Sequence, residues 1–275
     1  MSVVMTAVWK YRKLTLQAYC SKLRGFLAMI HQAYPSLTPN GFYEVGRKAN
    51  DETHIDANFN NLNGLAKKWG FNNYERAAKS YKMDADGTPA WDSISEFGYE
   101  LGFVNGIKFG KGKLHISVFA GSFSVAFPNS IVIEFMDDFY PDAKTINKWW
   151  DFLKIVIHCW DPEHIRITDG DFKFVKKVEN KQDDLDVTWI TYISNAKIRE
   201  IKDKAIDLIN FGTGAVIELT PTPPDPEDAT AVAKAIYIRD VLRAHGLLKY
   251  REPDAAELSR PSVQSTSADL PDGIF

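Results

Sequence analysis

The chain has 275 residues, enough for one large domain or two small ones, and its 45% hydrophobic and 25% charged residues exclude an intrinsically disordered protein. Its only two cysteines, Cys20 and Cys159, exclude a disulfide framework and favour a reducing compartment. No segment approaches the roughly 20 consecutive apolar residues of a membrane span. We therefore expect a soluble, cytoplasmic protein without a membrane partner.

The net charge of −3 is distributed unevenly along the chain. Residues 1–82 carry 12 Lys and Arg against 5 Asp and Glu, a balance of +7, and residues 83–275 carry 21 against 31, a balance of −10. A mostly acidic chain disfavours direct binding of nucleic acid, which requires a cationic surface. The acidic surplus favours a basic protein partner, unless it is only a solvated surface.

The first part of the chain predicts a strand followed by helices. Val3–Trp9 is β-branched and apolar, which is typical of a strand. Apolar residues then recur at three- and four-residue steps over residues 14–31, which predicts an amphipathic helix. A similar stripe predicts a second helix over His54–Trp69, and Asn72–Lys82 reads as a short third helix.

The middle of the chain changes to a two-residue period. Alternating apolar positions separated by glycine-containing turns predict an antiparallel meander of three or four strands within Phe97–Phe135. An amphipathic pattern then predicts a helix over residues 144–158, which the Asp161-Pro162 pair separates from a short strand, Ile165–Thr168.

The last part predicts a charged loop over residues 176–186 and strands at Val187–Ser194 and Ala215–Thr220. Helices are expected at Ile198–Ile209, between these strands, and at residues 229–245, after them. The mixture predicts an α+β fold, an antiparallel sheet with packed helices in a single domain covering residues 1–250. Residues 251–275, rich in Pro, Ser and Asp, form a C-terminal tail.

Two groups of residues have the composition of a metal site or a phosphate-binding loop but lack its spacing. His158, Cys159, Glu163 and His164 are close in sequence, but adjacent residues on a helix point about 100° apart and no second Cys-His pair completes a zinc site. The glycine pairs at 110–112 and 212–214 lack the spacing of a phosphate-binding loop and are interpreted as turns. We expect no catalytic residues, no metal and no cofactor.

A metal-dependent nuclease of the restriction type remains an alternative. Such enzymes place an Asp after a Pro and then a Glu/Asp-x-Lys triplet, whose carboxylates hold Mg²⁺. Pro141-Asp142 is followed by three triplets of this kind, which begin at Asp171, Glu179 and Glu200. Triplets of this composition arise often by chance in a chain that is one-quarter charged.

Two acidic groups are the remaining candidates for a binding surface. Carboxylates in predicted loops suit a cationic protein partner, because opposed potentials accelerate association. Solvated loops without a partner are the alternative. The predicted partner-binding residues are Asp137, Asp138, Asp142, Asp183, Asp184 and Asp186.

Several short segments, spread over most of residues 1–250, together resemble a known family. They are Phe103–Gly106, Leu114–Val118 with Gly121, Pro128–Ile133, His158–Pro162, Trp189–Ser194, Gly214–Thr220, Asp225 and Asp228, the helix containing Ala233 and Leu242, and the end Gly246–Leu248. In this order they resemble the immunity protein 52 family of bacterial polymorphic toxin systems. The acidic loop around Asp183 and the tail have no counterpart in that family.

The resemblance implies an intracellular antidote rather than an enzyme. A member of the family binds and neutralises a cognate nuclease effector toxin of a type VI secretion system, and so protects the producing cell and its kin. The family has no catalytic residues to transfer to this chain. A non-catalytic adaptor protein without a toxin partner is the other alternative to the nuclease.

Overall fold

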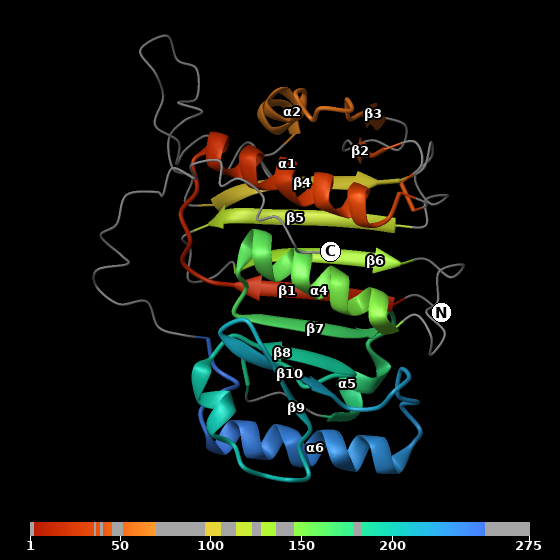
Figure 1. Cartoon of the computed structure of the whole chain (residues 1–275), viewed down its shortest axis with the longest axis vertical. Helices are drawn as coiled ribbons and strands as arrows, with labels where there is room; N and C mark the ends of the chain where they lie inside the picture. The colour runs from red at the N-terminus through yellow and green to blue at the C-terminus, as the bar shows by residue number, and fades with distance from the viewer. Residues whose placement is uncertain are drawn as a thin grey trace.

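The fold is built on one large sheet in which every pair of neighbouring strands is antiparallel (Figure 1). The computed structural model describes residues 3–35, 37–38, 41–45, 52–69, 97–105, 114–122, 128–135, 146–178 and 183–250. The ten strands found among these residues lie in the order β3-β2-β4-β5-β6-β1-β7-β8-β10-β9. Their bounds are β1 Val3–Trp9, β2 Tyr43–Val45, β3 Glu52–His54, β4 Phe97–Val104, β5 Leu114–Ser122, β6 Asn129–Phe135, β7 His164–Asp169, β8 Ile190–Ile193, β9 Leu208–Phe211 and β10 Gly214–Glu218.

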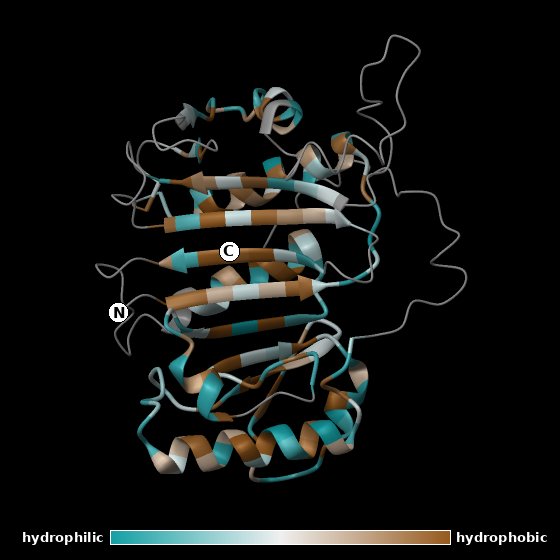
Figure 2. Cartoon of the chain, turned by 180° about the vertical axis from the view of Figure 1, so that it is seen from behind, coloured by the Kyte–Doolittle hydropathy of each residue, from teal (hydrophilic) through white to brown (hydrophobic). Residues whose placement is uncertain are grey.

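The helices cover the sheet in two places. In Figure 1, α1 (Leu16–Ala33) and α4 (Ile146–Trp160) lie across one face of the sheet, and α2 (Leu62–Trp69) lies near β2 and β3. Two further helices, α5 (Lys173–Val178) and α6 (Ala229–Ala244), pack at the β8-β10-β9 end. Seen from behind in Figure 2, strands β4, β5, β6 and β1 carry no described helix on the opposite face.

Two groups of buried side chains share the sheet and join the halves into one domain. The larger core lies under α1 and α4, and the smaller core lies under α5 and α6. Strand β10 contributes to both, because Val216 belongs to the larger core while Ala215 and Ile217 belong to the smaller one. Successive side chains of a strand point to opposite faces. The prediction of a single α+β domain with an antiparallel sheet is therefore confirmed.

The alternation predicted for the central strands is present in the structure. Alternate residues of β5 and β6 are buried, and most of the residues between them are half-buried, including the polar Ser117 and Glu134 and the apolar Phe119 and Val132. The long helices also agree with their predicted positions within two residues. Thr15 caps α1 by accepting a hydrogen bond from the amide of Ala18 at 3.1 Å, and Asp228 caps α6 through the amides of Thr230 and Ala231.

The predicted helix at His54–Trp69 is wrong in its first half. Residue 54 ends strand β3, and the helix begins only at Leu62. Between them, the Asp56 carboxylate accepts hydrogen bonds from the amides of Asn58, Asn60 and Asn61. These local bonds compete with the helical pattern, and Phe59 takes a positive φ of 57° that a helix does not allow.

The predicted helix at Ile198–Ile209 is also wrong. A short 3₁₀ helix, η3, spans Ala196–Glu200, and the chain then extends into β9. The apolar spacing that suggested a helix instead places Ile198, Ile201 and Ile206 in the smaller core. Strand β9 forms because the two-residue turn Gly212-Thr213 folds it against β10, with Gly212 at a φ of 54°.

Other differences are at the margins of elements. Residues 173–178 form α5, which overlaps the predicted charged loop, and the strand predicted at Val187–Ser194 is restricted to Ile190–Ile193. The short strands β2, β3 and β9 were not predicted. The predicted helix at Asn72–Lys82 and the tail at residues 251–275 lie outside the described residues.

Two glycines provide a matched test of the packing of β10. A Cβ atom on Gly214 would lie 1.8 Å from the carbonyl oxygen of Ile193, whereas a Cβ atom on Gly25 in α1 would meet nothing within 4 Å. We expect Gly214→Ala to lower the free energy of unfolding by about 3 kcal/mol, because the backbones of β8 and β10 must separate. Gly25→Ala should raise it by about 0.5–1 kcal/mol. Urea unfolding of both variants measures the contrast, and equal effects would contradict the described strand pairing.

Candidate functional site

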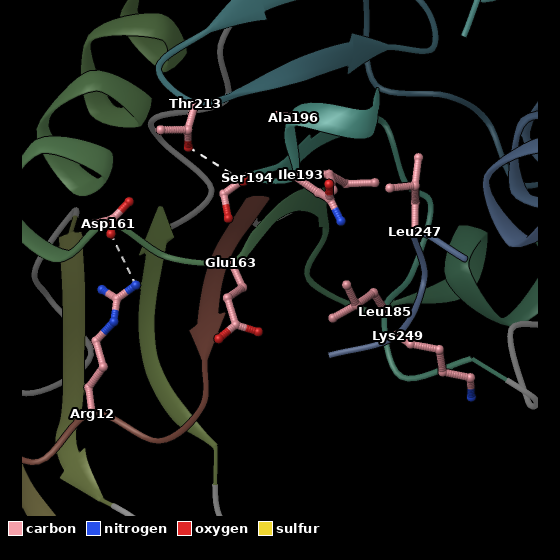
Figure 3. Close-up of a pocket in the computed structure, with 11 residues that line it drawn as sticks. Arg12, Asp161, Glu163, Leu185, Ile193, Ser194, Ala196, Thr213, Leu247 and Lys249 are labelled. Carbon is pink, nitrogen blue, oxygen red and sulfur yellow. Dashed lines mark hydrogen bonds and ion pairs between the residues drawn. The ribbon is translucent and has the colours of Figure 1, made fainter. Parts of the chain in front are cut away.

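A pocket of about 350 Å³ opens beside the ends of three neighbouring strands, β1, β7 and β8. Four chain segments meet there: the end of β1, the start of β7, the end of β8, and the turn between β9 and β10. The chain that follows α6 closes the remaining side. The lining residues, most of them labelled in Figure 3, are Arg12, Asp161, Glu163, Leu185, Ile193, Ser194, Asn195, Ala196, Thr213, Leu247 and Lys249.

The backbone at the pocket is fixed by the end of α4 and the start of β7. The amide of Asp161 donates to the carbonyl of Ile157 at 2.8 Å, and Asp161 then turns the chain with a positive φ of 45°. Asp is among the few residues that adopt this conformation readily. Two further bonds extend the sheet to Glu163: its amide donates to Val8, and its carbonyl accepts from Ser194 at 2.9 Å.

The rim of the pocket carries charges of both signs. The Arg12 guanidinium lies 3.1 Å from the Asp161 carboxylate (Figure 3). It also donates to the carbonyl of Trp160. On the same side, the Glu163 carboxylate accepts from the amide of Lys10 at 3.2 Å. Lys249, on the opposite side, is exposed.

The floor of the pocket is apolar, because Leu185, Ile193 and Leu247 are all buried members of the smaller core. In Figure 3, Leu185 and Leu247 lie on the side of the pocket away from the Arg12–Asp161 pair. An apolar floor inside a polar rim suits a side chain with an apolar body and a polar end. The pocket can therefore accept an anchoring side chain of another protein.

The structure places Asp183 in an internal ion pair. Its carboxylate accepts three hydrogen bonds from the Arg243 guanidinium, at 2.7 to 3.2 Å, and only 2% of its side chain is exposed. Hydrogen bonding to Asp183 raises the pKa of Arg243. Asp183 therefore joins the loop to the end of α6 and presents little charge to solvent.

Asp184 and Asp186 occupy different environments. Asp186 is ion-paired with Arg166 on β7, and its side chain is 22% exposed. Asp184 is 41% exposed, accepts from the amide of Tyr250 at 3.3 Å, and lies 4.0 Å from the Lys249 ammonium. Of these three carboxylates, Asp184 is the most available to a partner. Asp137, Asp138 and Asp142 lie outside the described residues, and the partner-binding role of all six stays a prediction.

The candidate metal ligands His158, Cys159 and His164 lie in separate environments. His158 is exposed, and the Cys159 thiol lies 3.6 Å from the Met29 sulfur, with burial raising its pKa to about 12. His164 is buried, and its Nε2 lies 2.9 Å from the carbonyl oxygen of Asp186, so Nε2 carries the proton and donates. Within the described ranges, no three His, Cys, Asp or Glu side chains form a group that could hold a metal ion.

The triplets of the nuclease alternative are only partly described. Asp171 follows β7 and lies 3.1 Å from the ammonium of Lys173, with both side chains more than 60% exposed. Glu200 is exposed at the end of η3. Asp142 and Glu179 lie outside the described residues.

The pocket itself was missed by sequence reasoning. Its residues run from Arg12 to Lys249, and no local pattern connects them. Two local signals did mark its walls: the Asp161-Pro162 break after a helix and the glycines around Thr213. The first was interpreted as the break that ends a helix and the second as a turn, but a helix break and a turn that lie beside the same strand ends also form a surface.

Comparison with known proteins finds a distant structural similarity. No protein-family model and no curated protein matches the chain. The solved structure of the Pseudomonas aeruginosa T6SS protein PA0821 is similar, with 12% identity and a TM-score of 0.48 over 90% of this chain and 76% of that one. At this TM-score the similarity carries no argument about function. None of the helices in the described part combines the length and apolar character that crossing a bilayer requires.

The different environments of Asp183 and Asp184 predict that the same substitution destabilises the protein at Asp183 and has little effect at Asp184. Asp183→Asn removes the charge that pairs with Arg243, so we expect the thermal midpoint to fall by several degrees. Asp184→Asn changes an exposed carboxylate and should leave the midpoint nearly unchanged. Thermal unfolding followed by circular dichroism compares the two variants, and similar midpoints for both would show that the Asp183–Arg243 pair does not stabilise the loop.

Because His164 is buried, we expect the free energy of unfolding to fall in mild acid. Burial first, and then the Arg166 charge, lower its pKa to about 3, and the hydrogen bond to Asp186 opposes this only in part. In the unfolded chain the His pKa is near 6.5, so the unfolded chain binds the proton more readily than the folded one. The contribution of neutral His164 to the free energy of unfolding is therefore complete above about pH 6.5 and decreases as the pH falls below that value. Between pH 6.5 and 5 we expect a loss of about 2 kcal/mol.

Urea unfolding at these two pH values tests this contribution. His164→Gln should be less stable at neutral pH but should show a smaller loss on acidification. The exposed His158→Gln is the matched control and should behave like the wild type. The interpretation fails if His164→Gln and the wild type lose the same amount of free energy.

Proposed function

We propose that this protein is an immunity protein that binds and neutralises a cognate nuclease effector toxin of a type VI secretion system. It acts by contact and not by catalysis. The producing cell and its kin are protected because the bound toxin cannot attack their DNA. The proposal starts from the resemblance to the immunity protein 52 family and depends on how the resembling segments are arranged in space.

The observation that carries the proposal is the convergence of three of these segments. His158–Pro162 leads from the end of α4 towards β7, which pairs with β8, and Trp189–Ser194 and Gly214–Thr220 contain the paired strands β8 and β10. The first two segments supply Asp161, Ile193 and Ser194 to the pocket, and the third begins directly after Thr213. Segments that are spread over about 60 residues of sequence thus lie around one surface opening. This supports a shared binding surface at that opening.

The chemistry of this surface suits a cationic protein. A nuclease must present a basic surface to DNA, and exposed carboxylates such as Asp161 and Asp184 lie near the pocket. Opposed charges mainly raise the association rate, whereas anchoring side chains in desolvated pockets supply most of the affinity. We therefore assign the anchoring contact to the pocket and the steering to the carboxylates around it. Binding over the toxin's DNA cleft and binding elsewhere on the toxin are both compatible with this arrangement.

Co-expression with the product of the gene adjacent to its own tests the proposal. We expect the two proteins to co-purify and the cells to survive expression of that product, which should degrade DNA when expressed alone. Thr213→Arg should weaken binding at least tenfold, because the exposed Thr213 lies at the pocket and an arginine there would obstruct it.

Thr222→Arg is the matched control, since it adds the same charge at another exposed position between two prolines. It should bind like the wild type. Isothermal titration calorimetry with a catalytically inactive form of the toxin measures both variants. Absence of both co-purification and rescue with the wild-type protein would reject the antidote function, and equal binding by the two variants would reject the pocket as the anchoring site.

A further inference from the structure

Strand β9 is an edge strand of the sheet. It pairs with β10 on one side, and no other described strand lies on its other side. Its sequence, Leu-Ile-Asn-Phe, contains no charged residue and no proline. The opposite end strand, β3, has the sequence Glu-Thr-His. Charges and prolines are the usual means by which edge strands avoid pairing with other chains, so β9 lacks a protection that β3 has.

The turn between β9 and β10 determines which peptide groups face outward. Phe211 and Gly214 are paired directly across the two-residue turn, and in such a turn this pair carries the hydrogen bonds. Because hydrogen-bonding direction alternates along an antiparallel strand, Leu208 and Asn210 direct their N–H and C=O groups away from β10. These groups form a template for another strand.

An apolar surface continues from β9 towards α4. Ile209 is 38% exposed and lies on the same face as Phe211, whose ring centroid is 6.0 Å from that of Trp150. Trp150 and Phe211 are both only partly buried. A strand added beside β9 would place alternate side chains against this surface, which favours apolar residues at those positions.

The beginning of β9 is acidic. Asp207 precedes the strand, and Glu218 lies opposite it, one step beyond the last registered pair, Leu208 and Ile217. Burial, and then the charge of Asp207, raise the pKa of Glu218, although Lys234 opposes this. A cationic side chain placed near this pair of carboxylates would relieve their repulsion.

We propose that β9 binds an extended segment of the partner protein as an additional antiparallel or parallel strand, with apolar residues over Ile209 and Phe211 and a cationic residue near Asp207. This inference rests on the proposed function, since the partner is the toxin. A second copy of this chain is the less suitable occupant, because four paired residues fall well short of the roughly 1,200 Å² that a stable interface buries. A larger partner can pair with β9 and also fill the nearby pocket.

Two substitutions at Asn210 separate the backbone from the side chain. Asn210→Pro removes the outward N–H and blocks the approach of a strand, while edge strands tolerate proline at such positions. Asn210→Ala removes the side chain and keeps the N–H. With the adjacent gene's product as the probe, we expect Asn210→Pro to weaken binding at least tenfold and Asn210→Ala to bind within about twofold of the wild type.

Each outcome of the titration decides one question. Equal binding by both variants would overturn the strand addition while leaving the antidote function intact, and no binding by the wild type would overturn both. If Asn210→Pro does not fold, as judged by circular dichroism, Ile209→Lys compared with Ile209→Val provides the same contrast between a protected and an open edge. A dimer of the wild type in light scattering that Asn210→Pro dissociates would replace the toxin segment with a second copy.

Discussion

The aromatic cluster around Trp160 is the contact on which the rest of the structure depends. Trp160 ends α4, stacks on Trp9 of β1 with ring centroids 5.7 Å apart, and meets Tyr19 and Phe26 of α1 at 6.3 and 6.1 Å. All four side chains are buried. One side chain thus joins the sheet to α1 and α4, and aromatic pairs of this kind contribute to stability beyond their buried area. The next residue, Asp161, begins the pocket, so the cluster also positions the candidate site.

The pocket lies where the two halves of the molecule meet. Arg12 and Asp161, which flank the larger core, form the charged side of the pocket. The residues of its apolar floor belong to the smaller core. The loop carrying Leu185 is held in turn by the chain after α6, because the amides of Asp184 and Leu185 both donate to the carbonyl of Leu248. A change in either half that moves these residues therefore alters the shape of the pocket.

The fold was predictable from sequence where the pattern is local. Alternation along β5 and the apolar stripe of α1 each arise from one short segment facing one core, and both were found. Residues 55–61 were misread because hydrogen bonds to Asp56 compete with the helix, which apolar spacing alone does not reveal. The acidic loop shows why the candidate site could not be predicted. Its charges are visible in the sequence, but the sequence does not identify Arg243, 60 residues away, as the ion-pair partner of Asp183.

The central position of β1 has a consequence for how the protein is made. Residues 3–9 pair with β6 and β7, which lie more than 100 residues later in the sequence. During synthesis, this apolar strand leaves the ribosome long before either neighbour exists, at roughly 5–20 residues per second. Contacts of such high sequence separation also slow folding. The newly made chain must therefore keep Val3–Trp9 from aggregating for several seconds or longer, until β6 and β7 have been made and can pair with it.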